Sequence, residues 1–348
     1  MVRDAFFAIP GDLAAPTGGY SYDRRIIAEL PALGWRTEVI NLGDGFPYPT
    51  VDARATACAR LSALAPDRPV VIDGLAFGVL PDAAETLRAS HRLVALVHHP
   101  LALESGLSAS ETASLRASER SALGCARHVV ATSATVARAL VEDYGVACGS
   151  VSVIEPGTDR VCVPPRKNAR VVKLLAVGSV IPRKGYDVLV AALARLKHLP
   201  WQLAIAGDCG RSPQTHRQVK GEIARFDLAD RISLLGAVAS HQLAPLYASA
   251  DLFVLPSRFE GYGMAYTEAI AHGVPVVGTT AGAIPDTVPA SAGVLVPPDD
   301  IDALAAALQR LIENPADREC LAAGARAAMF PSWPQQAALF ARVLESVG

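Results

Sequence analysis

Residues 252–277 read LFVLPSRFEGYGMAYTEAIAHGVPVV, and this stretch indicates the fold. The apolar run Leu252 to Leu255 is typical of a buried parallel strand, while residues 264–270 carry helical periodicity. A turn with two glycines joins them, and the apolar residues 273–277 follow as a return strand. The stretch therefore predicts a strand, a turn, a helix and a further strand of an α/β sheet.

Two carboxylates, Glu260 and Glu268, lie eight positions apart around this turn. At about 1.5 Å of rise per helical residue, up to roughly 12 Å separates them along the axis, which is too far for an acid and base pair. They suit the two ends of an elongated ligand, such as a sugar at Glu260 and a ribose at Glu268. Glutamates at this spacing are more often solvated charge on a surface helix. The surrounding strands and glycines favour a ligand site, because open α/β sheets bind ligands at the carboxyl ends of their strands.

The pattern Glu-x7-Glu followed by Ala-x-Ala-x-Gly-x-Pro-Val-Val resembles retaining glycosyltransferases of the family 4 type, which have the GT-B fold. The resemblance extends over nearly the whole chain and is strongest from Lys173 to Pro297. It is thin between Gly43 and Pro69, where acceptor recognition usually resides. It implies an α/β protein of two facing Rossmann-like, doubly wound parallel-sheet domains, with a C-terminal helix that crosses back to the first domain.

The composition agrees with an ordered two-domain protein, because 348 residues are long for one core and 51% of them are hydrophobic. The net charge is −2, and residues 1–150 contain 13 Arg and no Lys against 16 acidic residues, so we expect no nucleic-acid partner. The lack of Lys also weakens the case for peripheral membrane contact without excluding it. The six cysteines form no Cys-x-x-Cys pair, which argues against a zinc site. An apparent strand begins near the N-terminus, so we expect neither a secretory signal nor a membrane span, and a cytoplasmic location.

Apolar runs alternate with amphipathic helical patterns in both halves of the chain, which predicts parallel sheets. In the first half we expect strands at 5–9, 37–41, 70–73, 93–98, 128–132 and 151–154. In the second half we expect them at 172–177, 202–206, 232–235, 252–255, 275–277 and 294–296. We divide the chain into an N-terminal acceptor-binding domain (1–160), a C-terminal donor-binding domain (170–329) and a terminal helix on the N-terminal domain (330–348). Residues 153–159 are interpreted as a hinge turn, and residues 160–170 as the interdomain connection.

Arg183 and Lys184 follow the first strand of the second half, on a turn bounded by Gly178 and Gly185. Cations at the start of a helix oppose its dipole, so an anion is their natural partner. The family binds the nucleotide diphosphate with such a pair, and the resemblance gives Arg183 and Lys184 this role.

In the first half, Gly18 and Gly19 lie between the first strand and a helix expected to begin near Tyr22. The family has a glycine-rich loop here, beside the donor diphosphate. A Rossmann Gly-x-Gly-x-x-Gly is absent from it, which disfavours NAD chemistry. The strand at 93–98 ends in two histidines, which could simply cap a turn. Counting from the strand, His98 matches the family's histidine near the donor sugar, and His99 is a candidate for the acceptor side.

Gly207 and Val238 match turns that line the family's nucleotide pocket. Residues 106–121, which follow His-His-Pro, are a candidate part of the acceptor pocket. Asp299 and Asp300 precede a helical run at 301–311 and are interpreted as its N-cap, so no metal is assigned.

The resemblance implies a retaining, metal-independent transfer of a sugar from a nucleoside diphosphate sugar to a small-molecule, glycan or lipid-head-group acceptor, without a cofactor. A UDP-sugar is favoured as the donor and GDP-mannose comes second. The expected catalytic residues are His98, Arg183, Lys184 and Glu260. The expected donor-binding residues are Gly18, Gly19, Gly207, Val238, Gly261, Tyr262, Gly263, Met264, Ala265 and Glu268. A GT-B phosphorylase, a sugar-nucleotide epimerase and a noncatalytic two-domain sugar- or nucleotide-binding protein remain as alternatives.

Overall fold

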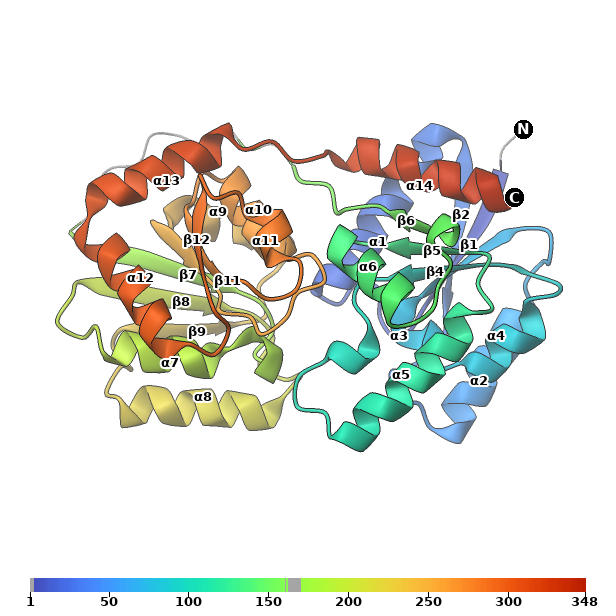
Figure 1. The fold of residues 1–348 in the computed structure, drawn as a ribbon, viewed down its shortest axis with the longest axis horizontal. Coiled ribbons are helices and arrows are strands. Elements are labelled where there is room, and N and C mark those ends of the chain that lie inside the picture. Colours follow the sequence, from blue (N-terminus) through green and yellow to red (C-terminus); the bar gives the residue numbers. More distant parts are fainter. Residues whose placement is uncertain (1–2, 160, 162–169) are drawn as a thin grey trace. The chain divides into compact units, whose positions relative to one another are not determined.

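The structure is a computed structural model that describes residues 3–159, 161 and 170–348. Its described residues form two compact units (Figure 1). Among the described residues, unit 1 comprises 3–15, 19–157 and 331–348, and unit 2 comprises 16–18, 158–159, 161 and 170–330. Most of the expected interdomain connection, residues 160 and 162–169, lies outside the described residues.

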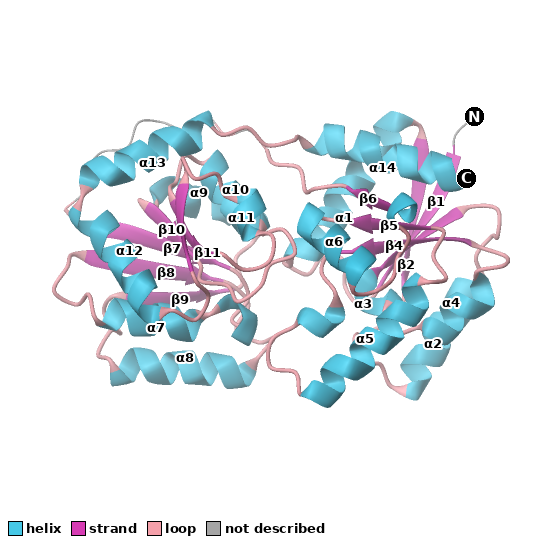
Figure 2. Ribbon diagram, in the orientation of Figure 1, coloured by secondary structure: helices cyan, strands magenta, loops and turns pink. Residues whose placement is uncertain are grey.

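Unit 1 is built on a six-stranded parallel sheet with the strand order β2-β1-β3-β4-β5-β6. Its strands are β1 (Arg3–Ile9), β2 (Trp35–Asn41), β3 (Pro69–Asp73), β4 (Arg92–Val97), β5 (His128–Ala131) and β6 (Val151–Val153). Strand β3 is buried along its whole length, and β4 is buried from its second residue on. Such continuous burial is typical of a parallel sheet with helices on both faces (Figure 2).

The helices of unit 1 are α1 (Gly18–Glu29), η1 (Leu30–Leu33), α2 (Val51–Ser62), α3 (Gly74–Phe77), α4 (Pro81–Leu87), η2 (Leu101–Leu103), α5 (Ala109–Leu123), α6 (Ala134–Glu142), η3 (Cys148–Ser150) and α14 (Trp333–Val347). Helix α14 packs on strand β1, where the ring of Phe340 stacks on that of Phe7 with centroids 5.7 Å apart. At the start of α14, a Cβ on Gly157 would lie 2.4 Å from the backbone nitrogen of Trp333, so only glycine fits there. The expectation that the terminal helix packs on the first domain is confirmed.

Unit 2 has a second six-stranded parallel sheet with the order β12-β11-β10-β7-β8-β9. Its strands are β7 (Val172–Val177), β8 (Trp201–Ala206), β9 (Ile232–Gly236), β10 (Leu252–Val254), β11 (Val276–Thr279) and β12 (Gly293–Val296). Its helices are η4 (Pro182–Lys184), α7 (Tyr186–Ala194), α8 (Pro213–Arg225), α9 (Ser240–Ser249), α10 (Met264–Ala271), α11 (Ile284–Thr287), α12 (Ile301–Glu313) and α13 (Pro315–Ala327).

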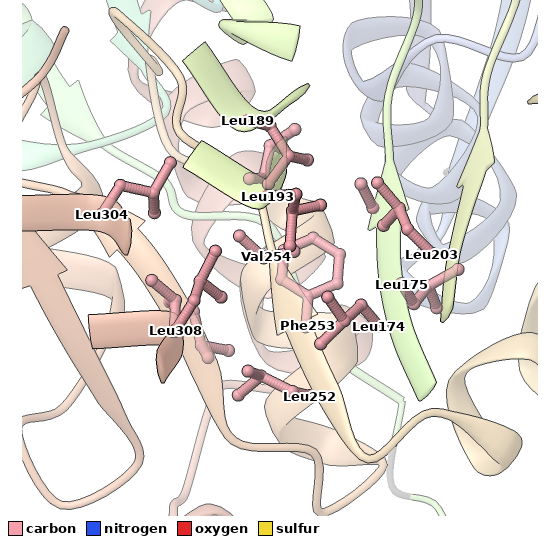
Figure 3. Packing of buried hydrophobic residues seen from close by; sticks show 14 of the residues in the cluster. Leu174, Leu175, Leu189, Leu193, Leu203, Leu252, Phe253, Val254, Leu304 and Leu308 are labelled. Carbon is pink, nitrogen blue, oxygen red and sulfur yellow. The ribbon is translucent and has the colours of Figure 1, made fainter. Parts of the chain in front are cut away.

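Phe253 lies at the centre of the unit 2 core and is fully buried. Figure 3 shows leucines of strands β7 and β8 and of helices α7 and α12 gathered around its ring. The two middle strands, β7 and β10, are therefore held rigidly, which matters because the loops after them carry charged side chains.

In each sheet the strand order reverses once, between β1 and β3 in unit 1 and between β7 and β10 in unit 2. In open α/β sheets, the loops at the carboxyl ends of the strands on either side of such a reversal diverge and leave a crevice for ligands. Residues 178–185 follow β7, and residues 255–263 follow β10. The segment that resembles the family motif thus lies at the reversal point of unit 2.

Each strand expected from the sequence is present, with bounds that differ by two residues at most. One boundary was wrong, because helix α1 begins at Gly18 and not near Tyr22, so the two glycines form its first turn. Residues 109–121 of the candidate acceptor segment are helical and belong to α5, which begins with a capping box between Ser108 and Glu111. Asp300 caps α12 as expected, accepting from the backbone N–H of Ala303, but Asp299 does not take part in this cap.

Candidate functional site

The turn after β7 presents Arg183 and Lys184 on a single 3₁₀ turn, η4. Gly185 ends this turn with a φ of +67°, and a Cβ there would lie 2.1 Å from the carbonyl oxygen of Pro256. Glycine is therefore required, both for the left-handed backbone and for the close approach of the loop after β10. This contact brings the two loops at the reversal point together.

The carboxylate of Glu260 lies against both cations. Lys184 Nζ is 2.5 Å from Oε1, and Arg183 Nη1 is 3.1 Å from Oε2. The buried hydroxyl of Ser257 donates to Oε1 at 2.6 Å, and Arg183 also donates to the carbonyl of Phe259 at 2.8 Å. Burial by itself would raise the pKa of Glu260, but the charges of Lys184 and Arg183 and the hydrogen bonds outweigh it and lower the pKa to about 2.

These three residues form a largely buried ion cluster with two positive charges and one negative charge. Glu260 is 6% exposed, and the side chains of Arg183 and Lys184 are 12% and 13% exposed. The formal charge of these three residues taken by themselves is +1. In a site of low dielectric constant such an excess favours an anion, and a diphosphate fits the bidentate Arg and the point charge of Lys.

Arg258 braces the loop that carries Glu260 against the turn that carries Arg183. Its guanidinium donates to both carboxylate oxygens of Asp187, at 3.1 and 2.7 Å, and to Asp299 Oδ1 at 2.7 Å. Its backbone N–H donates to the carbonyl of Arg183 at 2.7 Å. Asp299 has a φ of +60°, which is uncommon for a residue other than glycine. A strained backbone is thus kept at a residue that holds Arg258.

Gly282 lies tightly against the backbone of Glu260, because a Cβ on Gly282 would be 2.4 Å from the carbonyl oxygen of Glu260. Ala283 donates its backbone N–H to the same oxygen at 2.9 Å. The position of Glu260 is therefore fixed from both its side chain and its main chain.

Residues 261–263 lead from Glu260 into α10, and Gly263 precedes the helix with a φ of +97°. Met264 and Ala265 are half-buried in its first turn, and the carbonyl of Tyr262 accepts from Thr287 Oγ1 at 2.7 Å. Glu268 is half-buried one turn further on, and Tyr247 donates to its Oε2 at 2.9 Å. The second carboxylate of the motif is thus held by a hydrogen bond from α9.

The two other expected donor-binding positions of unit 2 lie at neighbouring strand ends. A Cβ on Gly207 would be 1.8 Å from the carbonyl of Gly178, so the backbones after β7 and β8 cross in close contact. Val238 is half-buried between β9 and α9. The expected site residues of unit 2 therefore gather at the carboxyl edge of its sheet.

In unit 1, His98 follows β4 and meets two buried carboxylates. His98 Nε2 lies 3.1 Å from Asp23 Oδ1 and 3.7 Å from Asp73 Oδ2. Asp23 is on α1 and is fully buried, and Asp73 ends β3 and is 2% exposed. The ring of His98 packs on Gly19, where a Cβ would be 3.0 Å from its Cδ2.

The pKa values of Asp73 and His98 shift upward. Burial and the charge of Asp23 raise the pKa of Asp73 to about 7. Burial lowers the pKa of His98, but the charge and hydrogen bond of Asp23 and the charge of Asp73 outweigh it, so the net shift is upward from 6.5.

Asp23, Asp73 and His98 each offer a ligand atom, all within 4.8 Å of one another, which is close enough for a metal site. The distances favour an ion pair instead, because His98 Nε2 faces a carboxylate oxygen at hydrogen-bond distance and Asp73 Oδ1 accepts from Leu75 N at 2.7 Å. A protonated Nε2 cannot bind a metal. We therefore interpret the three residues as a hydrogen-bonded ion cluster.

His99 lies apart from these carboxylates, with Nε2 3.5 Å from Glu104 Oε2. No helix among the described residues is long and apolar enough to cross a membrane.

The sequence did not single out four residues that contact the expected site residues or their loops: Asp23, Asp73, Tyr247 and Arg258. Three of them carried no signal, because an Asp on an amphipathic helix, an Asp at a strand end and a Tyr in a helix are ordinary. Arg258 and Ser257 lay inside the decisive motif and could have been singled out as the polar residues between the strand and Glu260.

Comparison with known proteins points to one family. Residues 171–314 match the family model described as Glycosyl transferases group 1. A D-inositol 3-phosphate glycosyltransferase from Streptosporangium roseum is 32% identical over 245 residues, which cover 65% of this chain and 56% of that protein. A mannosylfructose-phosphate synthase from Agrobacterium fabrum is 32% identical over 173 residues, which cover 45% and 38%. The chain spans about half the length of the first of these curated relatives and less of the second.

Solved structures agree on the fold. A sucrose-phosphate synthase from Thermosynechococcus elongatus matches with a TM-score of 0.84 at 23% identity, covering 99% of each chain. The Anabaena protein HepE in complex with UDP and glucose matches with a TM-score of 0.76 at 18% identity, covering 98% of this chain and 99% of that one. The GT-B fold expected from the sequence is confirmed.

Proposed function

We propose that this chain belongs to the group 1, or family 4, glycosyltransferases and transfers a sugar from a nucleoside diphosphate sugar to an acceptor nucleophile with retention at the anomeric carbon. The observation that carries the proposal is the cluster of Arg183, Lys184 and Glu260 at the reversal point of the unit 2 sheet. Its two cations lie where an open α/β sheet binds its ligand.

The chemistry needs stabilisation of a leaving diphosphate. As the bond to the sugar breaks, negative charge grows on the diphosphate oxygen, and preorganised cations lower the energy of that state. Arg183 and Lys184 supply these cations, and Glu260, Ser257 and Gly282 hold them and their loop in place. We propose that a donor phosphate oxygen takes the proton of the acceptor, so no enzymic nucleophile and no divalent metal is required.

The other expected residues would bind the rest of the donor. Glu268, oriented by Tyr247, would accept hydrogen bonds from the ribose diol. The backbones of residues 261–265, Gly207 and Val238 would approach the diphosphate and the base. Glu260 would also hold sugar hydroxyls, and His98 in unit 1 would bind the sugar, as its resemblance to the family's histidine implies.

We propose a UDP-sugar as the donor, with GDP-mannose second, and a small-molecule, glycan or lipid-head-group acceptor in the cytoplasm. One matching structure contains UDP and glucose, and a matching relative from Corynebacterium glutamicum is named as GDP-mannose-dependent, so both bases occur among similar proteins.

The proposal is tested first by thermal unfolding of the purified protein with UDP, GDP, ADP and NAD, each with and without EDTA. A ligand that binds only the folded protein raises the midpoint. We expect one nucleoside diphosphate to raise it, without an effect of EDTA. Glu268→Ala should abolish this shift, whereas Glu313→Ala, at an exposed position of the same unit, should leave it unchanged.

Turnover then separates the alternatives. Release of the nucleoside diphosphate only in the presence of an acceptor supports transfer. Phosphate-dependent turnover would identify a phosphorylase, and conversion of the donor without an acceptor would identify an epimerase. Binding without any release would identify a noncatalytic protein. Stabilisation by NAD alone, or by none of the four ligands at millimolar concentration, would contradict the proposed donor site.

A further inference from the structure

The cluster of Asp23, Asp73 and His98 lies at the reversal point of the unit 1 sheet. Asp73 ends β3, next to the reversal, Asp23 lies on the helix that follows β1, and His98 follows β4. Asp23 is fully buried, and its Oδ2 has no hydrogen-bond partner among the described residues. The side chain of His98 is 20% exposed, so it is not fully closed off from solvent.

We infer that Asp23 and Asp73 are positioning residues that keep His98 as an imidazolium, with Nε2–H directed at Asp23 and Nδ1–H available to an oxygen of the donor. In this state His98 donates a hydrogen bond and cannot act as a general base. The proposed function assigns sugar binding to His98. The identity of the ligand in this inference rests on that function.

Charge balance is the first argument. If His98 were neutral and both carboxylates were ionised, the cluster would hold two uncompensated negative charges, and buried charges of this kind are costly. With a proton on His98 and one on Asp73, the formal charge of the cluster is zero. The upward pKa shifts of Asp73 and His98 agree with this distribution of protons.

The fixed orientation of the ring is the second argument. Gly19 packs against Cδ2, and the edge of the Tyr22 ring meets the imidazole with centroids 5.4 Å apart. Thr132 donates to the backbone carbonyl of His98 at 3.0 Å. Because the ring is held on these sides and at Nε2, Nδ1 is the nitrogen left to bind the ligand.

The charged and titratable neighbours are few. Asp23 and Tyr22 face the imidazole from α1, and Asp73 faces it from the end of β3. Tyr22 donates to the carbonyl of Ile154, and burial raises its pKa well above 10, so it stays neutral. Thr132, from the segment after β5, is uncharged. Among the described residues, the two groups whose charges act on the imidazole, Asp23 and Asp73, are therefore both acids.

The test is a titration of the histidine resonances by NMR in the free protein. The chain has eight histidines, and His98→Gln identifies the signal. We expect His98 to titrate above 6.5, with both ring nitrogens protonated at pH 6. Asp23→Asn should lower this midpoint by roughly one pH unit or more, because burial then acts without the nearest anion. Asp73→Asn should lower it by less, and Asp52→Asn, at an exposed position on α2, should not move it.

A His98 midpoint at or below 6.5 in the wild type, or one unchanged in Asp23→Asn, would overturn the inference. So would loss of the titration on addition of stoichiometric Zn²⁺ and its return with EDTA, which would identify a metal site.

A second measurement connects the cluster to the donor. The affinity for the nucleotide sugar should fall as the pH rises through the His98 midpoint, whereas the affinity for the nucleoside diphosphate, which lacks the sugar, should not. An equal fall for both ligands would contradict the assignment of Nδ1 to the sugar. If neither ligand binds at any pH, the proposed function fails, while the NMR titration still decides the state of His98.

Discussion

The two units place buried carboxylates at equivalent points of their sheets, yet the pKa values of these carboxylates shift in opposite directions. Glu260 in unit 2 has a pKa lowered to about 2, and Asp73 in unit 1 has one raised to about 7. Burial is similar, with 6% and 2% of each residue exposed. The difference lies in the neighbours, because Glu260 has two cations against it and Asp73 has a second carboxylate and one imidazole. Burial destabilises the ionised form of both carboxyl groups, and the charges of the neighbours decide whether the net pKa shift is downward or upward.

The comparison suggests different ligands for the two edges. The unit 2 cluster has an excess of positive charge and suits a diphosphate. The unit 1 cluster has no net charge when His98 and Asp73 are both protonated. Such a cluster suits an uncharged sugar, which needs a hydrogen-bond donor but no compensating charge.

The largest expected effect comes from removing a cation of unit 2. Arg183→Ala or Lys184→Ala should lower kcat/KM by about 10²- to 10³-fold, because each removes charge stabilisation of the leaving diphosphate and leaves Glu260 with one cation. Steady-state kinetics measure this loss. Arg195→Ala is the matched control, since Arg195 pairs with Asp302 at an exposed position of unit 2 and should retain activity. Equal losses in the control and the test variants would show that the effect is not local.

Next in size is the stability that the ionised Glu260 confers. A pKa of about 2 in the folded protein against an ordinary value of 4.5 corresponds to up to about 3 kcal/mol. Since the folded pKa is lowered, this contribution is present above pH 4.5 and is lost as the pH falls toward 2. Urea unfolding of the wild type and Glu260→Gln should therefore differ at pH 7 and converge as the pH falls to about 2. A difference that does not depend on pH would mean that the variant acts through packing alone.

Asp73 should show the opposite dependence, with a smaller effect. Its folded pKa of about 7 lies above the ordinary 3.8, so the folded protein holds a proton that the unfolded chain releases, and stability falls as the pH rises from about 4 to 7. Asp73→Asn keeps the oxygen that accepts from Leu75 and removes the titration. Its free energy of unfolding should vary less between pH 5 and pH 8 than that of the wild type, by about 2–3 kcal/mol. Unchanged slopes would remove Asp73 from the pH-dependent cluster.

The sequence predicted the sheets well because strand signals are local. The apolar run at Val172–Val177 coincides with β7, and the glycines around Glu260 indicate the turn before α10. The partners within each cluster could not be predicted from local pattern. Lys184 and Glu260 are 76 residues apart, and Asp23 and His98 are 75 apart. Only the strand order brings them together, and an isolated Asp on an amphipathic helix is more often a solvated charge.

A third buried carboxyl group sharpens the comparison, and its substitution should have the smallest effect at acidic pH. Glu119 on α5 is 1% exposed and accepts from the backbone N–H of Leu101 at 3.0 Å, and burial raises its pKa to about 8. Below about pH 4.5 the group is protonated in both the folded protein and the unfolded chain, so Glu119→Gln should change the free energy of unfolding there by less than about 1 kcal/mol. Because the folded pKa is raised, wild-type stability should fall relative to the variant as the pH increases from about 4.5 to 8, and thermal unfolding at pH 6 and pH 9 measures this change. A gain in wild-type stability relative to the variant over that range would mean that Glu119 has a cation partner. Nearby positive charge would then no longer be the feature that distinguishes Glu260 from the other buried carboxyl groups.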